Sequence, residues 1–192
     1  MKALLLFVLM VSGCQVLAAD EPAESPAMTP QELPGYQFDQ KQAQAPAVVS
    51  DLSVGQSYYM DRQREEAKNL LSQKLGILHF NAELADMTSL QQLYDRKVLG
   101  KDDARDWQNV GVLFGDILAK QFSLHWVSYK DDLGISKCLQ WRDTQNFVFP
   151  VTMFSKRMQF DEQIDVRAIY DDIKSTVEAF KAREARLGKA EE

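Results

Sequence analysis

The stretch Asp106-Trp-Gln-Asn-Val-Gly-Val-Leu-Phe-Gly-Asp-Ile-Leu-Ala-Lys120 decides the fold of this chain. Its apolar residues recur every three or four positions and cover more than one side, which predicts a central, buried helix. Asp102 and Asp103 precede it as cap residues, and their charge suits the positive end of a helix. Gly111 and Gly115 each weaken a helix by about 1 kcal/mol relative to alanine, so we expect them to admit a neighbouring backbone.

Downstream of this helix the apolar period changes to two. Segments 124–130, 135–142 and 146–151 have strand character and are separated by turn-forming residues, which predicts an antiparallel meander. Pro150 should mark the end of the third strand, because proline cannot donate to a ladder. The sequence therefore predicts an α+β fold with helices over one face of a three-stranded antiparallel meander.

Three further helices complete the predicted domain. Capping-box patterns at 53–56 and 88–91 open helices that run to about residues 75 and 98. Gly76 suits the left-handed position after the first of these helices. Asp165 caps the last helix, whose apolar residues keep the helical spacing. About four helices thus belong to one compact domain over residues 51–187, followed by a charged tail, 188–192, that we expect to fray.

The N-terminal residues predict export. Lys2 and the apolar run from Ala3 to Val11 are too short to span a bilayer, which takes about 20 residues, and fit a secretory signal. Two processing alternatives stand: a signal peptide over 1–19, or a lipoprotein signal over 1–13 with Cys14 lipidated. Segment 20–50 holds five of the six prolines and predicts a disordered linker. We expect a periplasmic protein, either soluble or anchored to the outer membrane by lipid.

Composition excludes several classes of partner. The net charge of −6 and the pI near 5.0 argue against nucleic acid and against a polybasic membrane reader, which leaves Cys14 as the sole predicted membrane contact. Cys138 is the other cysteine, and we expect it to be a buried filler without a disulfide partner.

The middle of the chain resembles a known family. The features are Leu124-His-Trp-Val127, Asp131-Asp-Leu-Gly134 and Phe149-Pro-Val-Thr-Met-Phe-Ser-Lys-Arg157, preceded by Trp107 and the two glycines. Together they resemble the bacterial family known as Domain of Unknown Function 3806, over about residues 91–169. The resemblance implies a compact bacterial α+β domain and brings no activity with it.

Catalytic and metal motifs do not emerge from the sequence. Metal-ligand spacings, nucleophile motifs and phosphate-binding loops are missing, so we predict no catalytic residue, metal or cofactor. The best candidate for binding is the segment after Pro150, which sets a basic pair beside apolar residues. The predicted contact residues are Thr152, Ser155, Lys156, Arg157 and Trp126. The alternative is that Asp161, Glu162 or Asp165 neutralises the basic pair.

Three functions follow as hypotheses. The first is a non-catalytic binding or interaction module whose partner is an envelope or secreted protein, for example as an inhibitor or immunity protein that masks a toxin. The alternative is a small periplasmic hydrolase with a site formed by His125, Asp131 and Arg157. The third is a spacer in the envelope.

Overall fold

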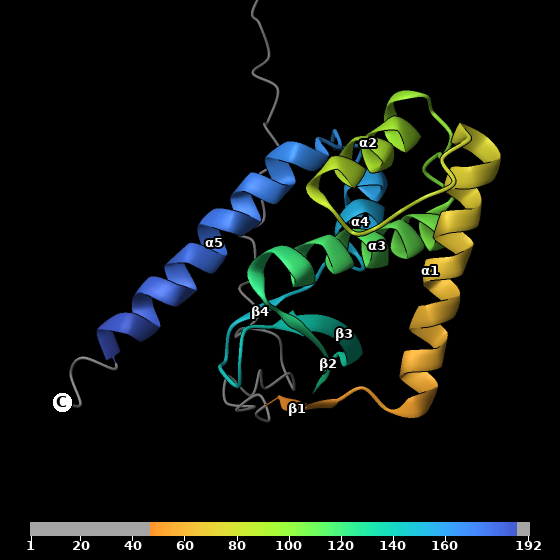
Figure 1. Cartoon of the computed structure of the whole chain (residues 1–192). Coiled ribbons are helices and arrows are strands. Elements are labelled where there is room, and N and C mark those ends of the chain that lie inside the picture. The colour runs from red at the N-terminus through yellow and green to blue at the C-terminus, as the bar shows by residue number, and fades with distance from the viewer. Residues whose placement is uncertain (1–46, 188–192) are drawn as a thin grey trace, which may run out of the picture. The chain divides into compact units, whose positions relative to one another are not determined.

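The structure is a computed structural model that describes residues 47–187. The elements in chain order are β1 (Val48–Asp51), α1 (Val54–Leu75), the short 3-10 helix η2 (Leu84–Asp86), α2 (Met87–Asp95), α3 (Ala104–Phe122), β2 (His125–Asp131), β3 (Gly134–Gln140), β4 (Phe147–Val148), α4 (Met153–Gln159) and α5 (Val166–Leu187). In Figure 1, α3 lies between the sheet and α2, and α5 extends away from the other helices. The predicted α+β class is confirmed.

The sheet has the order β1-β2-β3-β4, and each strand is antiparallel to its neighbour. The meander of three consecutive strands is therefore confirmed, and β1 extends it by a fourth strand. Val48 to Asp51 pair with Lys130 to Val127. The linker predicted over 20–50 is thus wrong at its last three residues, which belong to β1. A four-residue strand has no readable period of its own, and the ladder that β2 offers holds it in place.

The two glycines of α3 lie where the chain after β4 crosses the helix. A Cβ atom built on Gly111 would lie 2.5 Å from the carbonyl oxygen of Val151 and 2.6 Å from that of Pro150. A Cβ atom on Gly115 would overlap the indole ring of Trp126, with the Cη2 atom 2.6 Å away, and would lie 2.8 Å from the ring of Pro150. The predicted close approach of a neighbouring backbone is confirmed at Gly111, and at Gly115 two side-chain rings take that place.

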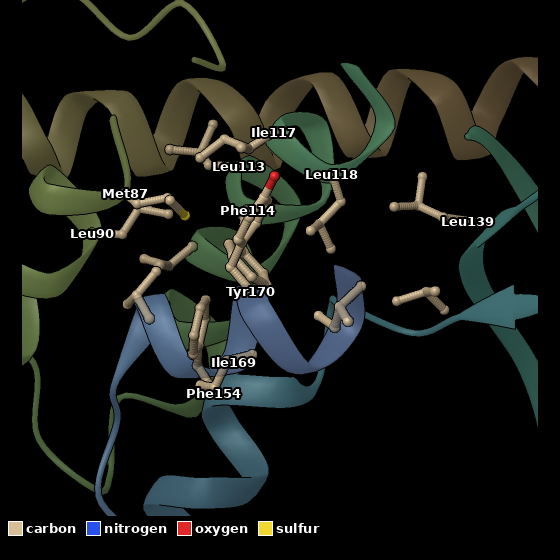
Figure 2. Close-up of a cluster of buried hydrophobic side chains, with 14 of the residues drawn as sticks. Met87, Leu90, Leu113, Phe114, Ile117, Leu118, Leu139, Phe154, Ile169 and Tyr170 are labelled. Atoms are coloured by element: carbon tan, nitrogen blue, oxygen red, sulfur yellow. The ribbon is translucent and has the colours of Figure 1, made fainter. Parts of the chain in front are cut away.

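The core forms around α3. Figure 2 shows apolar side chains from α2, β3, α4 and α5 meeting those of α3. Phe114 packs against Phe154 of α4 with ring centroids 5.2 Å apart, and Phe122 stacks on Tyr170 of α5 at 5.4 Å. Burial raises the pKa of Tyr170. Every helix of the domain therefore meets α3 directly or through a helix that does.

Local signals account for most helix ends. Ser53 and Gln56 form the predicted capping box at the start of α1, and Gly76 ends that helix with φ +71°. The Asp165 carboxylate accepts from the backbone N–H of Ala168 at 2.9 Å, which confirms the predicted cap of α5. Asp103 occupies the position before α3, but its carboxylate accepts from the N–H of Gly100 at 2.7 Å. The predicted side-chain cap of α3 is therefore not formed by Asp103.

The second capping box is wrong. α2 begins at Met87, and its preceding residue makes no side-chain cap. The Gln91 side chain instead accepts from the N–H of Val166 at 2.8 Å and donates to the carbonyl oxygen of Ile164 at 3.0 Å. This amide fastens the start of α5 to α2, a use that only the folded chain reveals.

The segment after the sheet also departs from the prediction. The third strand was expected over 146–151, but β4 holds Phe147–Val148 alone, and α4 begins five residues later. The chain turns at Pro150, whose carbonyl oxygen accepts from the N–H of Met153 at 3.1 Å. Within residues 47–187 there is no helix with the length and apolarity needed to cross a membrane. The signal, Cys14, the remainder of the linker and the tail 188–192 lie outside the described residues.

Candidate functional site

The segment singled out by the sequence forms α4. Phe154 on its inner side is fully buried and packs against Trp107 and Phe114, with ring centroids 6.1 and 5.2 Å away. Met153 and Met158 are half-buried beside it. These contacts fix which side of α4 faces outward, and Lys156 lies on that side.

Lys156 and Phe160 lie four residues apart on the outer side of α4, a spacing that makes them neighbours on a helix surface. Lys156 is exposed and forms no ion pair within residues 47–187. Phe160 ends the helix with 70% of its surface exposed. The backbone then turns at Asp161, with φ +56°, and the Asp161 carboxylate pairs with Lys101 at 2.7 Å. We call Lys156, Arg157 and Phe160 the basic–aromatic surface of α4.

Arg157 is half-buried and contributes to this surface mainly through its charge. Its guanidinium donates to the carbonyl oxygen of Met153, one turn back, at 3.1 Å. In the described part of the chain, neither Lys156 nor Arg157 forms an ion pair with Asp161, Glu162 or Asp165. Asp161 pairs with Lys101 instead, and Asp165 caps α5. The positive charge of α4 therefore remains without a carboxylate partner there.

The Ser155 hydroxyl at the start of α4 is used within the helix. Ser155 is buried, and its hydroxyl donates to the carbonyl oxygen of Thr152 at 3.3 Å. Thr152 precedes the first helical residue and makes no side-chain cap. The structure thus brings Thr152, Ser155, Lys156 and Arg157 together on one element, with the last two nearer the surface.

Trp126 belongs to a different part of the molecule. Its indole lies on Gly115, and its N–H donates to the Asp116 carboxylate at 3.0 Å. The guanidinium of Arg64 in α1 donates two hydrogen bonds of 2.8 Å to the same carboxylate. Hydrogen bonding to Asp116 is the main reason why the pKa of Arg64 is raised. These groups satisfy one another and tie α1, α3 and β2 together. The geometry gives Trp126 a structural role.

The three residues of the hydrolase hypothesis are not brought together. His125 and Asp131 are the first and last residues of β2, which separates them by about 20 Å at the usual rise of a strand. The Asp131 carboxylate accepts from the N–H of Leu133 within the hairpin turn at 2.9 Å. Within residues 47–187, no group of three or more His, Cys, Asp or Glu side chains is placed to hold a metal ion.

A groove lies between α2 and the start of α5, with a volume of about 610 Å³. Met87, Ile164 and Val166 supply apolar walls, and Gln91 lies at its base with its amide already bound to the backbone of α5. Arg167 at its rim pairs with Asp171 at 3.2 Å. Gln91 and Asp165 hold the start of α5, and Arg167 pairs within that helix, so these polar groups of the groove are already engaged.

Sequence reasoning missed Phe160 and the helical form of α4. A seven-residue helix that follows Pro150 has too little length for a pattern, and its stability comes from the burial of Phe154. The sequence did contain one signal for this surface: Lys156 and Phe160 are four positions apart, which makes them neighbours if the segment is helical. Their exposure depends on tertiary packing and could not be read from the sequence.

Comparison with known proteins finds a structure with a similar fold and a family that matches part of the chain. The chain resembles a crystal structure from Bacteroides thetaiotaomicron VPI-5482 with a TM-score of 0.61 and 15% identity, over 68% of this chain and 48% of that one. The chain thus spans about half the length of that protein, and the likeness concerns the fold alone. No curated protein matches the chain. Residues 86–170, from the cap of α2 into α5, match the family described as Domain of unknown function (DUF3806), as the sequence predicted.

Proposed function

We propose that this protein is a non-catalytic binding module of the bacterial cell envelope, which contacts a partner protein through the basic–aromatic surface of α4. The observation that carries the proposal is Phe160, a phenylalanine with 70% of its surface exposed, next to cations that have no carboxylate partner within residues 47–187. Aromatic and arginine side chains are enriched where proteins bind one another, and an exposed phenylalanine gains free energy once it is covered.

The electrostatics of the surface select the partner. The chain has a net charge of −6, yet α4 presents Lys156 and Arg157 together. A partner with carboxylates around an apolar pocket would complement this surface, and charge complementarity mainly raises the association rate and the specificity. An enzyme or toxin of the envelope that is masked by this module is one partner of that kind. The export signal and the linker predicted from the sequence support this location.

The experiment is quantitative capture of the partner from an envelope extract. The full chain and the double variant Lys156→Glu/Phe160→Ala are immobilised at equal density and compared. The matched control is Lys74→Glu/Tyr58→Ala, which changes an exposed lysine and an exposed tyrosine of α1. We expect one partner to be retained by the wild type and the control and reduced at least tenfold by the α4 variant. Equal capture by both variants would remove α4 from the proposal.

A further inference from the structure

The outer edge of β3 is open along most of its length. β4 pairs with Leu139 and Gln140 alone, whereas β3 begins at Gly134. Within the described residues, no strand pairs with the outer edge of Gly134 to Cys138. Such an edge presents unpaired backbone N–H and C=O groups and can accept another extended chain. Its side chains then decide which chain fits.

Those side chains combine apolar surface with cations on one face. The register aligns Val48, Lys130 and Ile135 across three strands, and Ser50, Ser128 and Lys137 in the next row. Cross-strand neighbours project to the same face of a sheet. Ile135 is 64% exposed and Leu133, in the turn beside it, is 97% exposed. Lys137 lies over the ring of Tyr59 at 4.4 Å, so its ammonium group is held in place near the edge.

Neither lysine is neutralised within the described residues, where no carboxylate pairs with Lys130 or Lys137. Lysine on an edge strand discourages pairing between two copies, because like charges would meet across the new ladder. A second copy of this edge would bring Lys137 toward its own equivalent. An acidic strand would instead relieve the charge and cover Ile135.

We infer that the open edge of β3 binds an extended segment of a partner protein that adds an antiparallel strand and carries an acidic residue two positions before an apolar one. In this register the acidic side chain lies opposite Lys137 and the apolar side chain opposite Ile135. The order follows from direction, since an antiparallel strand meets Lys137 before Ile135. This surface is separate from the basic–aromatic surface of α4, and either one can fail without the other.

The test uses synthetic ten-residue peptides and the full, isotope-labelled chain observed by NMR. The first peptide carries Glu-Thr-Val at its centre, the second Val-Thr-Glu, and the third Lys-Thr-Val. We expect the first to bind most tightly and to shift the amide resonances of residues 134–138. The variant Lys137→Glu should weaken the first peptide at least tenfold and favour the third. The matched control Lys181→Glu, an exposed lysine of α5, should change neither.

Two results would overturn the inference. One is that no peptide shifts the resonances of 134–138, or that the shifts lie elsewhere in the domain. The other is that the three peptides bind alike, or that Lys137→Glu leaves their order unchanged. Lys137 is half-buried at the edge of the sheet and outside the apolar core, so the fold should survive its replacement, and the unshifted resonances of the core will verify this.

Discussion

At the scale of single residues, Gly111 sets how closely the chain after β4 can approach α3. The space that a side chain would need is filled by two backbone carbonyl oxygens, which cannot rotate away as a side chain can. Glycine is therefore kept in the middle of a helix in spite of its low propensity. The contact is what lets the chain leave the sheet and enter α4 against the same helix.

Gly111→Ala should lower the free energy of unfolding by about 1–3 kcal/mol, because overpacking outweighs the gain of about 1 kcal/mol in helix propensity. Urea denaturation measures the difference. Gly55→Ala is the matched control, since that glycine lies in α1 with no atom within 4 Å of the added Cβ. The control should be neutral or slightly stabilising. Equal behaviour of the two variants would contradict the close approach at Gly111.

Cys138 gives a second test at this scale. Its side chain is fully buried in β3, and burial raises the pKa of its thiol from 9.0 to about 12. Cys138 of the native protein should therefore resist thiol reagents at pH 8, whereas Cys138 of the denatured chain reacts at once. The native state keeps the proton that the unfolded state releases, so this contribution to stability is present below pH 9 and is lost as the pH rises toward 12.

Denaturation curves between pH 8 and 11 check the sign. The wild type should lose stability above pH 9 faster than Cys138→Ala, by at most about 1.4 kcal/mol per pH unit. The comparison of slopes cancels the other groups that titrate in this range. Parallel curves would show that the thiol ionises as easily in the folded protein as in the unfolded one.

At the scale of elements, the joint between α2 and α5 depends on one amide. Gln91 satisfies the carbonyl oxygen of Ile164 and the N–H of Val166, two groups at the start of α5 that are 73 and 75 residues away in sequence. Gln91→Ala should leave both without their partner, at a cost of about 1–3 kcal/mol. Hydrogen exchange in the first turns of α5 should rise about tenfold, and Gln92→Ala, its half-buried neighbour, should not change it.

The ion pair between Arg64 and Asp116 joins α1 to α3. Both side chains are about one-fifth exposed, and the indole of Trp126 shares the carboxylate. A double-mutant cycle with Arg64→Ala and Asp116→Asn should give a coupling energy of about 1–3 kcal/mol, between the values for exposed and fully buried pairs. Arg62→Ala, whose pair with Glu66 is largely exposed, should cost under about 0.5 kcal/mol. A coupling near zero would mean that this ion pair does not help to hold α1 against α3.

At the scale of the whole molecule, the sequence predicted what depends on local spacing. The structure contains the helix predicted from the apolar spacing of α3, the capping box at Ser53 and the left-handed residue Gly76. Each of these features depends on residues within one or two helical turns. β1 was missed because its ladder comes from β2, far along the chain. The capping box predicted at 88–91 does not form, because the Gln91 side chain accepts a hydrogen bond from the backbone of α5 instead.

The candidate site was predictable only in part. The basic pair was visible in the sequence, and the structure places it on one short helix. Among the described residues, Lys156 has no carboxylate partner and Phe160 is exposed, and both outcomes depend on packing around Phe154 and on the pairing of Asp161 with Lys101. A local sequence pattern could not predict the ion pair between Lys101 and Asp161, because the two residues are 60 positions apart.

The measurement that tests the binding proposal most directly is photo-cross-linking in living bacteria. A photoreactive phenylalanine analogue replaces Phe160 in one strain and Tyr58 of α1 in another, both exposed aromatic positions. We predict one discrete cross-linked protein from position 160, lost when Lys156→Glu is added, and none of the same mass from position 58. A product of equal yield from both positions, or none from position 160, would contradict the assignment of α4 as the binding surface.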